Sequence, residues 1–263
     1  MPIIAEILAP SGTGKTTLYK KLQKKWKPQY KWAVYHDFRY QRRVLYTFPK
    51  DYFLVIKRKA DILKNVLFSS EIQYKQNSVH QVPNEKLFYQ NHTEFCDTVM
   101  KLISEHSAVG FNSEDKRFLN TYFFFETIEH LQAVMNHTED ERLCIMDEGL
   151  LSRLMHLNSP SFRENDVKSY MKHIPVPPVV FYLKCAPEII AERIDSREKV
   201  ATVHRSLTID DILKTTRETQ QFMELTLDFV KKKGSEIVEV NAEATADDMA
   251  VYIFERIDEI AKS

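Results

Sequence analysis

The segment that most constrains the fold is a short, mostly apolar run, Ile3 to Leu8, followed directly by a turn of small residues. The turn contains Gly12 and Gly14, although the whole chain has 5 glycines, where average usage would give roughly 18. Glycine permits backbone conformations that other residues adopt only with strain. The pattern therefore predicts a buried strand, a tight turn and then a helix from Gly14 to about Lys25.

The turn has the residues of a phosphate-binding loop. Its sequence follows the pattern G-x-x-x-x-G-K-[ST], except that Ala9 replaces the first glycine, and we expect Ala9 to adopt an ordinary conformation. Successive backbone N–H groups of such a turn form an anion-binding concavity, and the helix N-terminus adds partial positive charge. Lys15 can reach β- and γ-phosphates, and the Thr16 hydroxyl can coordinate Mg²⁺. The sequence therefore predicts ATP and Mg²⁺ as cofactors, with the nucleotide held by Ser11, Gly12, Thr13, Gly14, Lys15, Thr16 and Thr17.

A second acidic element follows an apolar run at 143–146. Asp147 and Glu148 come directly after this run, and Gly149 follows them. Carboxylates at the carboxyl end of a sheet strand face the crevice where ligands bind. We expect Asp147 to hold Mg²⁺, through water because Mg²⁺ dehydrates reluctantly, and Glu148 to act as general base or to contact the acceptor. The alternative is a pair of solvated acids at the start of a turn.

Two arginines, Arg193 and Arg197, lie four residues apart, on one face of a predicted helix that begins at Pro187. Phosphoryl transfer spreads negative charge over the transferred group, and arginines stabilise that charge. We predict both as catalytic, with a lid at about 194–208 that closes over the nucleotide. The alternative is ordinary surface pairing with Glu188 or Glu192.

The remaining pattern alternates strands with helices. Further strands are predicted at 32–36, 179–184 and 237–240, which makes five with the two already described. Strands separated by helices favour an α/β fold with a mostly parallel sheet. We predict one domain over residues 1–263, with a helical insertion at about 50–140. Thr208 with Asp211, and Thr245 with Asp248, have the spacing of helix caps.

Together, these features resemble the P-loop nucleoside and nucleotide kinases. The resemblance covers roughly residues 1–36 and 142–262. It implies a five-stranded parallel sheet in the order 2-3-1-4-5, and a lid that carries Arg193 and Arg197 over the phosphates. It also places the adenine near the loop at 241–243, and so makes Asn241 a nucleotide contact. One departure concerns the acceptor: Glu148 stands where the family commonly has an arginine after the acid, and the nearest downstream arginine is Arg153.

The acceptor side in such kinases follows the second strand. Asp37 can accept a hydroxyl hydrogen bond and is the second candidate for the general base. Arg39 and Arg42 can grip a phosphate, since arginine forks match phosphate oxygens. With Arg153 they are the predicted substrate-binding residues, and a charged, solvated helix start is the alternative. Core packing explains most of the four consecutive aromatic residues at 122–125, although one of them can stack on a flat acceptor.

Composition limits the class of protein. Lys plus Arg number 37 and Asp plus Glu number 37, so the basic excess usual in nucleic-acid binders is missing and no nucleic-acid partner is expected. No run is long and apolar enough for a membrane span, and no secretory signal is evident. Three scattered cysteines indicate free buried thiols in a reducing cytoplasm, and no histidine spacing indicates structural zinc.

The leading interpretation is an ATP- and Mg²⁺-dependent phosphotransferase acting on a small molecule. The alternative is a P-loop ATPase switch, because the second acid of the pair Asp147-Glu148 can activate water. The acceptor and the oligomeric state stay open at this point.

Overall fold

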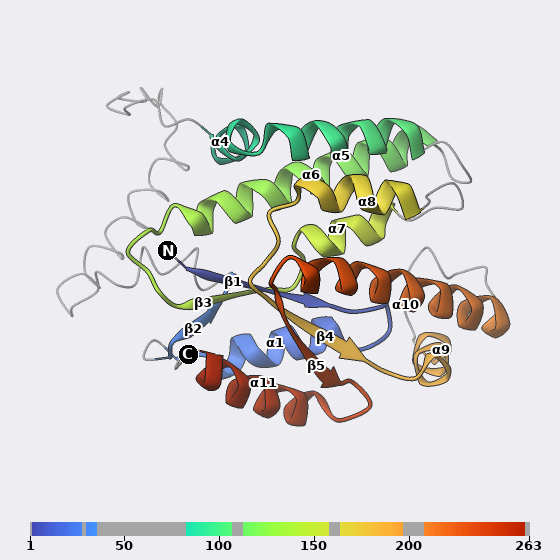
Figure 1. Cartoon of the computed structure of the whole chain (residues 1–263). Coiled ribbons are helices and arrows are strands. Elements are labelled where there is room, and N and C mark those ends of the chain that lie inside the picture. Colours follow the sequence, from blue (N-terminus) through green and yellow to red (C-terminus); the bar gives the residue numbers. More distant parts are fainter. Residues whose placement is uncertain are drawn as a thin grey trace, which may run out of the picture.

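The protein is described here from a computed structural model that covers residues 2–27, 30–35, 83–106, 113–157, 164–196 and 208–260. Its five described strands form one parallel sheet in the order β2-β3-β1-β4-β5 (Figure 1). The strands are β1 (Ile3–Leu8), β2 (Trp32–Val34), β3 (Leu143–Met146), β4 (Val179–Lys184) and β5 (Glu236–Asn241). The predicted α/β class and the order 2-3-1-4-5 are confirmed.

The central strands are apolar on both faces because helices cover both sides of the sheet. In β3, Leu143 and Ile145 belong to one apolar cluster, whereas Cys144 and Met146 belong to the other. Strand β1 keeps this alternation with one exception, Glu6, which lies 2% exposed on the face that Cys144 and Met146 share. A buried carboxylate in a central strand needs specific compensation.

Among the described helices, four contribute to the cluster of Leu143 and Ile145: α1 (Lys15–Lys25), α9 (Pro187–Asp195), α11 (Ala246–Ile260) and, through Ile212, the start of α10 (Ile209–Lys232). The other face of the sheet carries the larger helical layer (Figure 1). That layer comprises α4 (Asn84–Asn91), α5 (Thr93–His106), α6 (Ser113–Met135), α7 (Leu150–Leu157), α8 (Glu164–His173) and most of α10 (Ile209–Lys232).

Local capping explains several helix ends. Thr208 caps α10 in a capping box, in which its hydroxyl accepts from the Asp211 N–H and the Asp211 carboxylate accepts from the Thr208 N–H. Thr245 accepts from the Asp248 N–H in the same way at α11. Gly234, with φ 95°, follows the end of α10. Both predicted caps and this glycine stop are confirmed.

Some boundaries differ from prediction. Strand β2 ends at Val34, two residues before the predicted end, and α4 falls in a stretch that the periodicity left unassigned. α4 has one fully buried side chain, Phe88, and begins after Pro83 without a side-chain cap, so its sequence signal is weak. The predicted helix from Pro49 lies outside the described residues.

The three cysteines are free and buried, as predicted. Among the helices described, none is long and apolar enough to cross a membrane.

Candidate phosphate-binding site

The predicted phosphate-binding loop joins the end of β1 to the start of α1. Gly12 and Gly14 both have positive φ, 101° and 93°. A Cβ at Gly12 would lie 2.8 Å from Ile190 Cγ2, so this glycine is required both by its conformation and by close packing against α9. Thr13 is buried and its hydroxyl donates to the Pro10 carbonyl at 2.9 Å, which closes the turn. Gly14, by contrast, has open space where a Cβ would be.

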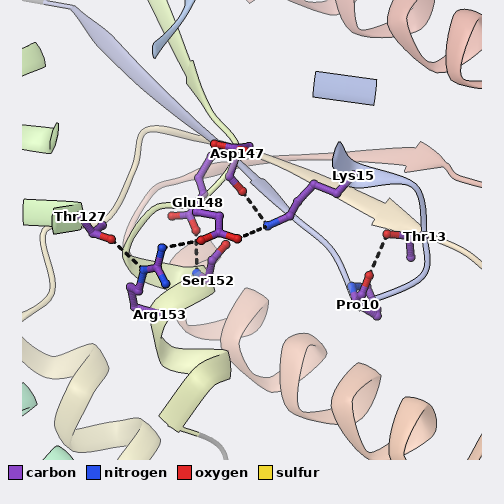
Figure 2. Close-up of polar contacts among 9 residues, drawn as sticks. Pro10, Thr13, Lys15, Thr127, Asp147, Glu148, Ser152 and Arg153 are labelled. Carbon is purple, nitrogen blue, oxygen red and sulfur yellow. Dashed lines mark hydrogen bonds and ion pairs between the residues drawn. The ribbon is translucent and has the colours of Figure 1, made fainter. Parts of the chain in front are cut away.

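Lys15 connects this loop to the acidic end of β3. Its ammonium donates to the Asp147 backbone carbonyl at 2.7 Å and lies 3.9 Å from Glu148 Oε1 (Figure 2). The predicted phosphate loop and the predicted acidic element are therefore brought together at one edge of the sheet. They lie 132 residues apart in the chain, so their meeting depends on the pairing of β1 with β3.

Arg153, on α7, completes a polar chain behind Lys15. Its Nη2 donates to Glu148 Oε2, and its Nε donates to Thr127 Oγ1 of α6 at 2.7 Å (Figure 2). The guanidinium carbon also lies 5.1 Å from the ring centroid of Phe123, within cation–π range. Arg153 is 8% exposed, so these contacts hold it in one place. Glu148 occupies the position after Asp147 where the resemblance predicts an arginine. An arginine from the next helix, Arg153 of α7, contacts Glu148 instead.

The charges around Glu148 determine its protonation. Burial opposes ionisation of this carboxyl, but the positive charges of Lys15, Arg153 and His156 outweigh burial and hold the pKa of Glu148 below its ordinary value. The Arg153 hydrogen bond acts in the same direction. Glu148 is therefore a carboxylate at neutral pH and a weak proton acceptor.

Glu6 positions the turn that carries these acids. Its two carboxylate oxygens accept from the backbone N–H groups of Leu151, at 3.1 Å, and Ser152, at 2.7 Å, in the first turn of α7. A Cβ at Gly149 would lie 2.4 Å from Glu6 Oε2, so the close approach requires glycine. Sequence reasoning did not identify Glu6, although a charged residue within an otherwise apolar strand was the available signal. Thr127 and Phe123 gave no such signal, because their contacts with Arg153 are tertiary.

A separate group of polar contacts surrounds the loop after β5. Arg193 Nη1 donates to the Ala242 carbonyl at 2.7 Å, and the Glu243 carboxylate accepts from the Ala186 N–H at 3.1 Å. The Asn241 side chain accepts from the Glu243 N–H at 3.0 Å. Arg193 thus lies against the loop predicted to adjoin adenine, and its polar contacts with described residues do not include Lys15 or Glu148. Its assignment to the phosphates stays a prediction.

The other predicted residues divide into two groups. The side chains of Ser11, Thr16 and Thr17 are exposed, where a ligand can reach them. Residues predicted to bind substrate or close the lid lie outside the described residues: Asp37, Arg39, Arg42 and Arg197.

The donor set fits a nucleotide with Mg²⁺. The open space at Gly14 leaves room for a phosphate at the helix N-terminus, where backbone N–H groups favour anions. A hydroxyl and a carboxylate, from Thr16 and Asp147, are ligand types that Mg²⁺ accepts.

No protein-family model matches this sequence, and no curated protein sequence matches it. Among solved structures, the chain is similar to deoxyadenosine kinase from M. mycoides with bound dATP, at 11% identity and a TM-score of 0.46, covering 97% of this chain and 100% of that chain. It is also similar to shikimate kinase from Bacteroides thetaiotaomicron, at 10% identity and a TM-score of 0.40, covering 97% of this chain and 98% of that chain. At identities this low the likeness concerns the fold alone.

Proposed function

We propose that this chain is a small-molecule kinase that transfers the γ-phosphate of ATP, with Mg²⁺, to a small acceptor. The observation that carries the proposal is the contact of Lys15 with the Asp147 carbonyl, beside Glu148. It joins a phosphate cradle, a lysine ammonium and an acidic strand end within one site. Phosphoryl transfer needs little more from a protein than positioning and charge stabilisation.

In this proposal each residue has one task. The loop at 11–17 holds the phosphates, and Lys15 moves from the Asp147 carbonyl onto them. Thr16 and Asp147 hold Mg²⁺, which would neutralise charge on the phosphates when bound. Arg193 supports the nucleotide on the side of its base, since its guanidinium is fixed at Ala242, and Asn241 belongs to the same loop.

The engagement of Glu148 by Arg153 and Lys15 supports a positioning role for Glu148. A carboxylate with a lowered pKa abstracts a proton poorly. Asp37 then remains the candidate for the general base. The same consideration weighs against the second candidate function, an ATPase switch, because that function needs Glu148 to activate water.

The test is ADP release by the purified protein with ATP and Mg²⁺, alone and with nucleosides, nucleoside monophosphates and sugars. Acceptor-dependent release is expected, with a loss of about 10²–10³ in rate in Lys15→Ala, as for removal of one transition-state donor elsewhere. Lys20→Ala is the matched control, because Lys20 is an exposed lysine on the same helix. Steady ADP release without any acceptor, lost in Lys15→Ala, would instead establish the ATPase.

A further inference from the structure

A cavity of about 180 Å³ lies on the helical side of the sheet, and its described lining includes no residue of the phosphate-binding loop. Among its lining residues are Ile4 of β1, Phe88 of α4 and Leu131 of α6. The loop before β4 closes another side with three prolines and Val176. For comparison, an apolar cavity of about 150 Å³ in another protein stays dry and binds benzene. The space therefore suits a molecule with a single ring or a short branched chain.

Glu6 gives this apolar cavity a charged end. It is the one charged side chain among the described lining residues, and it is 2% exposed. Within the described part of the chain, no lysine, arginine or histidine lies within ion-pair distance of it. Two backbone N–H groups and the N-terminus of α7 compensate its charge only in part. Burial accordingly raises the pKa of Glu6, against the opposing effects of those hydrogen bonds, of the Ser152 side chain and of Lys15.

The carboxylate also has unused hydrogen-bonding capacity. An ionised carboxylate offers about four acceptor positions, and the N–H groups of Leu151 and Ser152 occupy one on each oxygen. A cation that reached Glu6 would donate a hydrogen bond to a remaining acceptor position and would supply a positive charge to balance the carboxylate. An apolar ligand without a donor would do neither.

We propose that this cavity is a binding site for a small organic ammonium, whose positive group pairs with Glu6 and whose hydrocarbon part occupies the apolar space. The site contains no residue of the phosphate-binding loop, but it shares two residues with the structure around the acidic turn: Gly149, which belongs to that turn, and Glu6, which holds the first turn of α7. The proposal does not depend on the proposed kinase activity.

The first experiment compares ligands of one shape and different charge by calorimetry on the full chain. Benzylamine is expected to bind about tenfold or more tightly than benzyl alcohol, because its ammonium forms an ion pair with Glu6 in addition to the hydrogen bond that either ligand can donate. Equal affinities for the two, or no heat with benzylamine at millimolar concentration, would overturn the proposal.

A second experiment locates the ligand. The chain has 5 glycines, and each follows a different residue type, so ¹⁵N-glycine combined with ¹³C-carbonyl glutamate identifies the Glu148–Gly149 amide uniquely. Benzylamine is expected to shift the Gly149 signal and to leave the Gly234 signal in place. A shift at Gly234 with none at Gly149 would place the ligand elsewhere and contradict the proposal.

A blocking variant completes the test. Val176→Phe places a ring in the cavity from a loop position that is half-buried, so the fold is expected to tolerate it. Benzylamine binding should be lost in this variant and kept in Val251→Phe, which makes the same change at an exposed position of α11. Because the affinity ratio of the two ligands is measured on the unmodified chain, the proposal stays testable even if Val176→Phe fails to fold.

Discussion

Lys15 and Asp147 are joined through the backbone carbonyl of Asp147, with Nζ 2.7 Å from the oxygen. The same ammonium lies 3.9 Å from Glu148 Oε1, so a carboxylate also orients the lysine. A phosphate that takes the ammonium would replace the carbonyl acceptor with a charged one, and hydrogen bonds to charged groups are the stronger ones.

Arg153 is expected to support both stability and catalysis. Arg153→Ala removes one partner each from Glu148 and Thr127, and we expect a loss of roughly 1–3 kcal/mol in the free energy of unfolding, together with a fall in kcat. Urea denaturation and steady-state kinetics measure the two effects. Arg217→Ala is the control, since Arg217 pairs with Glu188 at a site where both side chains are 56% exposed, and a change of about 0–1 kcal/mol is expected there. Equal effects of the two substitutions would contradict this role.

Gly149→Ala is expected to destabilise the protein, because the added Cβ would lie 2.4 Å from Glu6 Oε2. Overpacking of this kind costs on the order of 1–3 kcal/mol. A double-mutant cycle with Glu6→Ala checks the cause: the cost of Gly149→Ala should shrink once the carboxylate is removed. An unchanged cost would mean that Glu6 is not what the Cβ meets.

Thr208→Ala removes the cap of α10, and we expect a loss of about 1 kcal/mol. The control is Thr219→Ala on the same helix, where the hydroxyl donates to the Thr215 carbonyl within the helix and alanine is the better helix former. Thermal unfolding should therefore separate the two variants. If Thr219→Ala lowered the midpoint as much as Thr208→Ala, the capping interpretation would fail.

Glu6 is expected to make stability depend on pH. Since burial raises its pKa in the folded state above the ordinary value of 4.5, the folded state binds the proton more tightly than the unfolded state. The contribution of Glu6 to stability is therefore largest below pH 4.5 and falls as pH rises through the folded pKa. We would measure the free energy of unfolding of the unmodified protein and of Glu6→Gln from below pH 4.5 upward. The difference between the two isolates the contribution of Glu6, because both proteins share the other titrating groups. A difference between the two proteins that does not vary with pH would contradict it.

The phosphate-binding loop could be predicted because its signal is local: consecutive residues around Gly12 and Gly14 define it. The order of the strands in the sheet has no local signal, and it was predicted from the family resemblance that this loop supports. Asp147 and Glu148 were placed correctly at the strand end for the same reason.

The contacts of individual side chains could not be predicted in this way. Arg193 lies 49 residues from Ala242, and no pattern in either segment indicates that they meet. Arg153 was noticed as the nearest arginine after the acids, but its contact with Thr127 depends on how α6 packs on α7. Glu6 was overlooked because a strand pattern tolerates one exception, and its partners lie 145 and 146 residues away.

Strand β1 carries Glu6, which fixes the first turn of α7, and two residues later it ends at Leu8, where the phosphate-binding loop begins. One strand therefore connects both halves of the site. Because the loop with Lys15 and the turn with Glu148 are both attached to β1, we expect them to move together when the sheet twists or the helical layer shifts. A consequence of this arrangement is that a shift in the register of β1 would displace the loop with Lys15 and the turn with Glu148 at the same time.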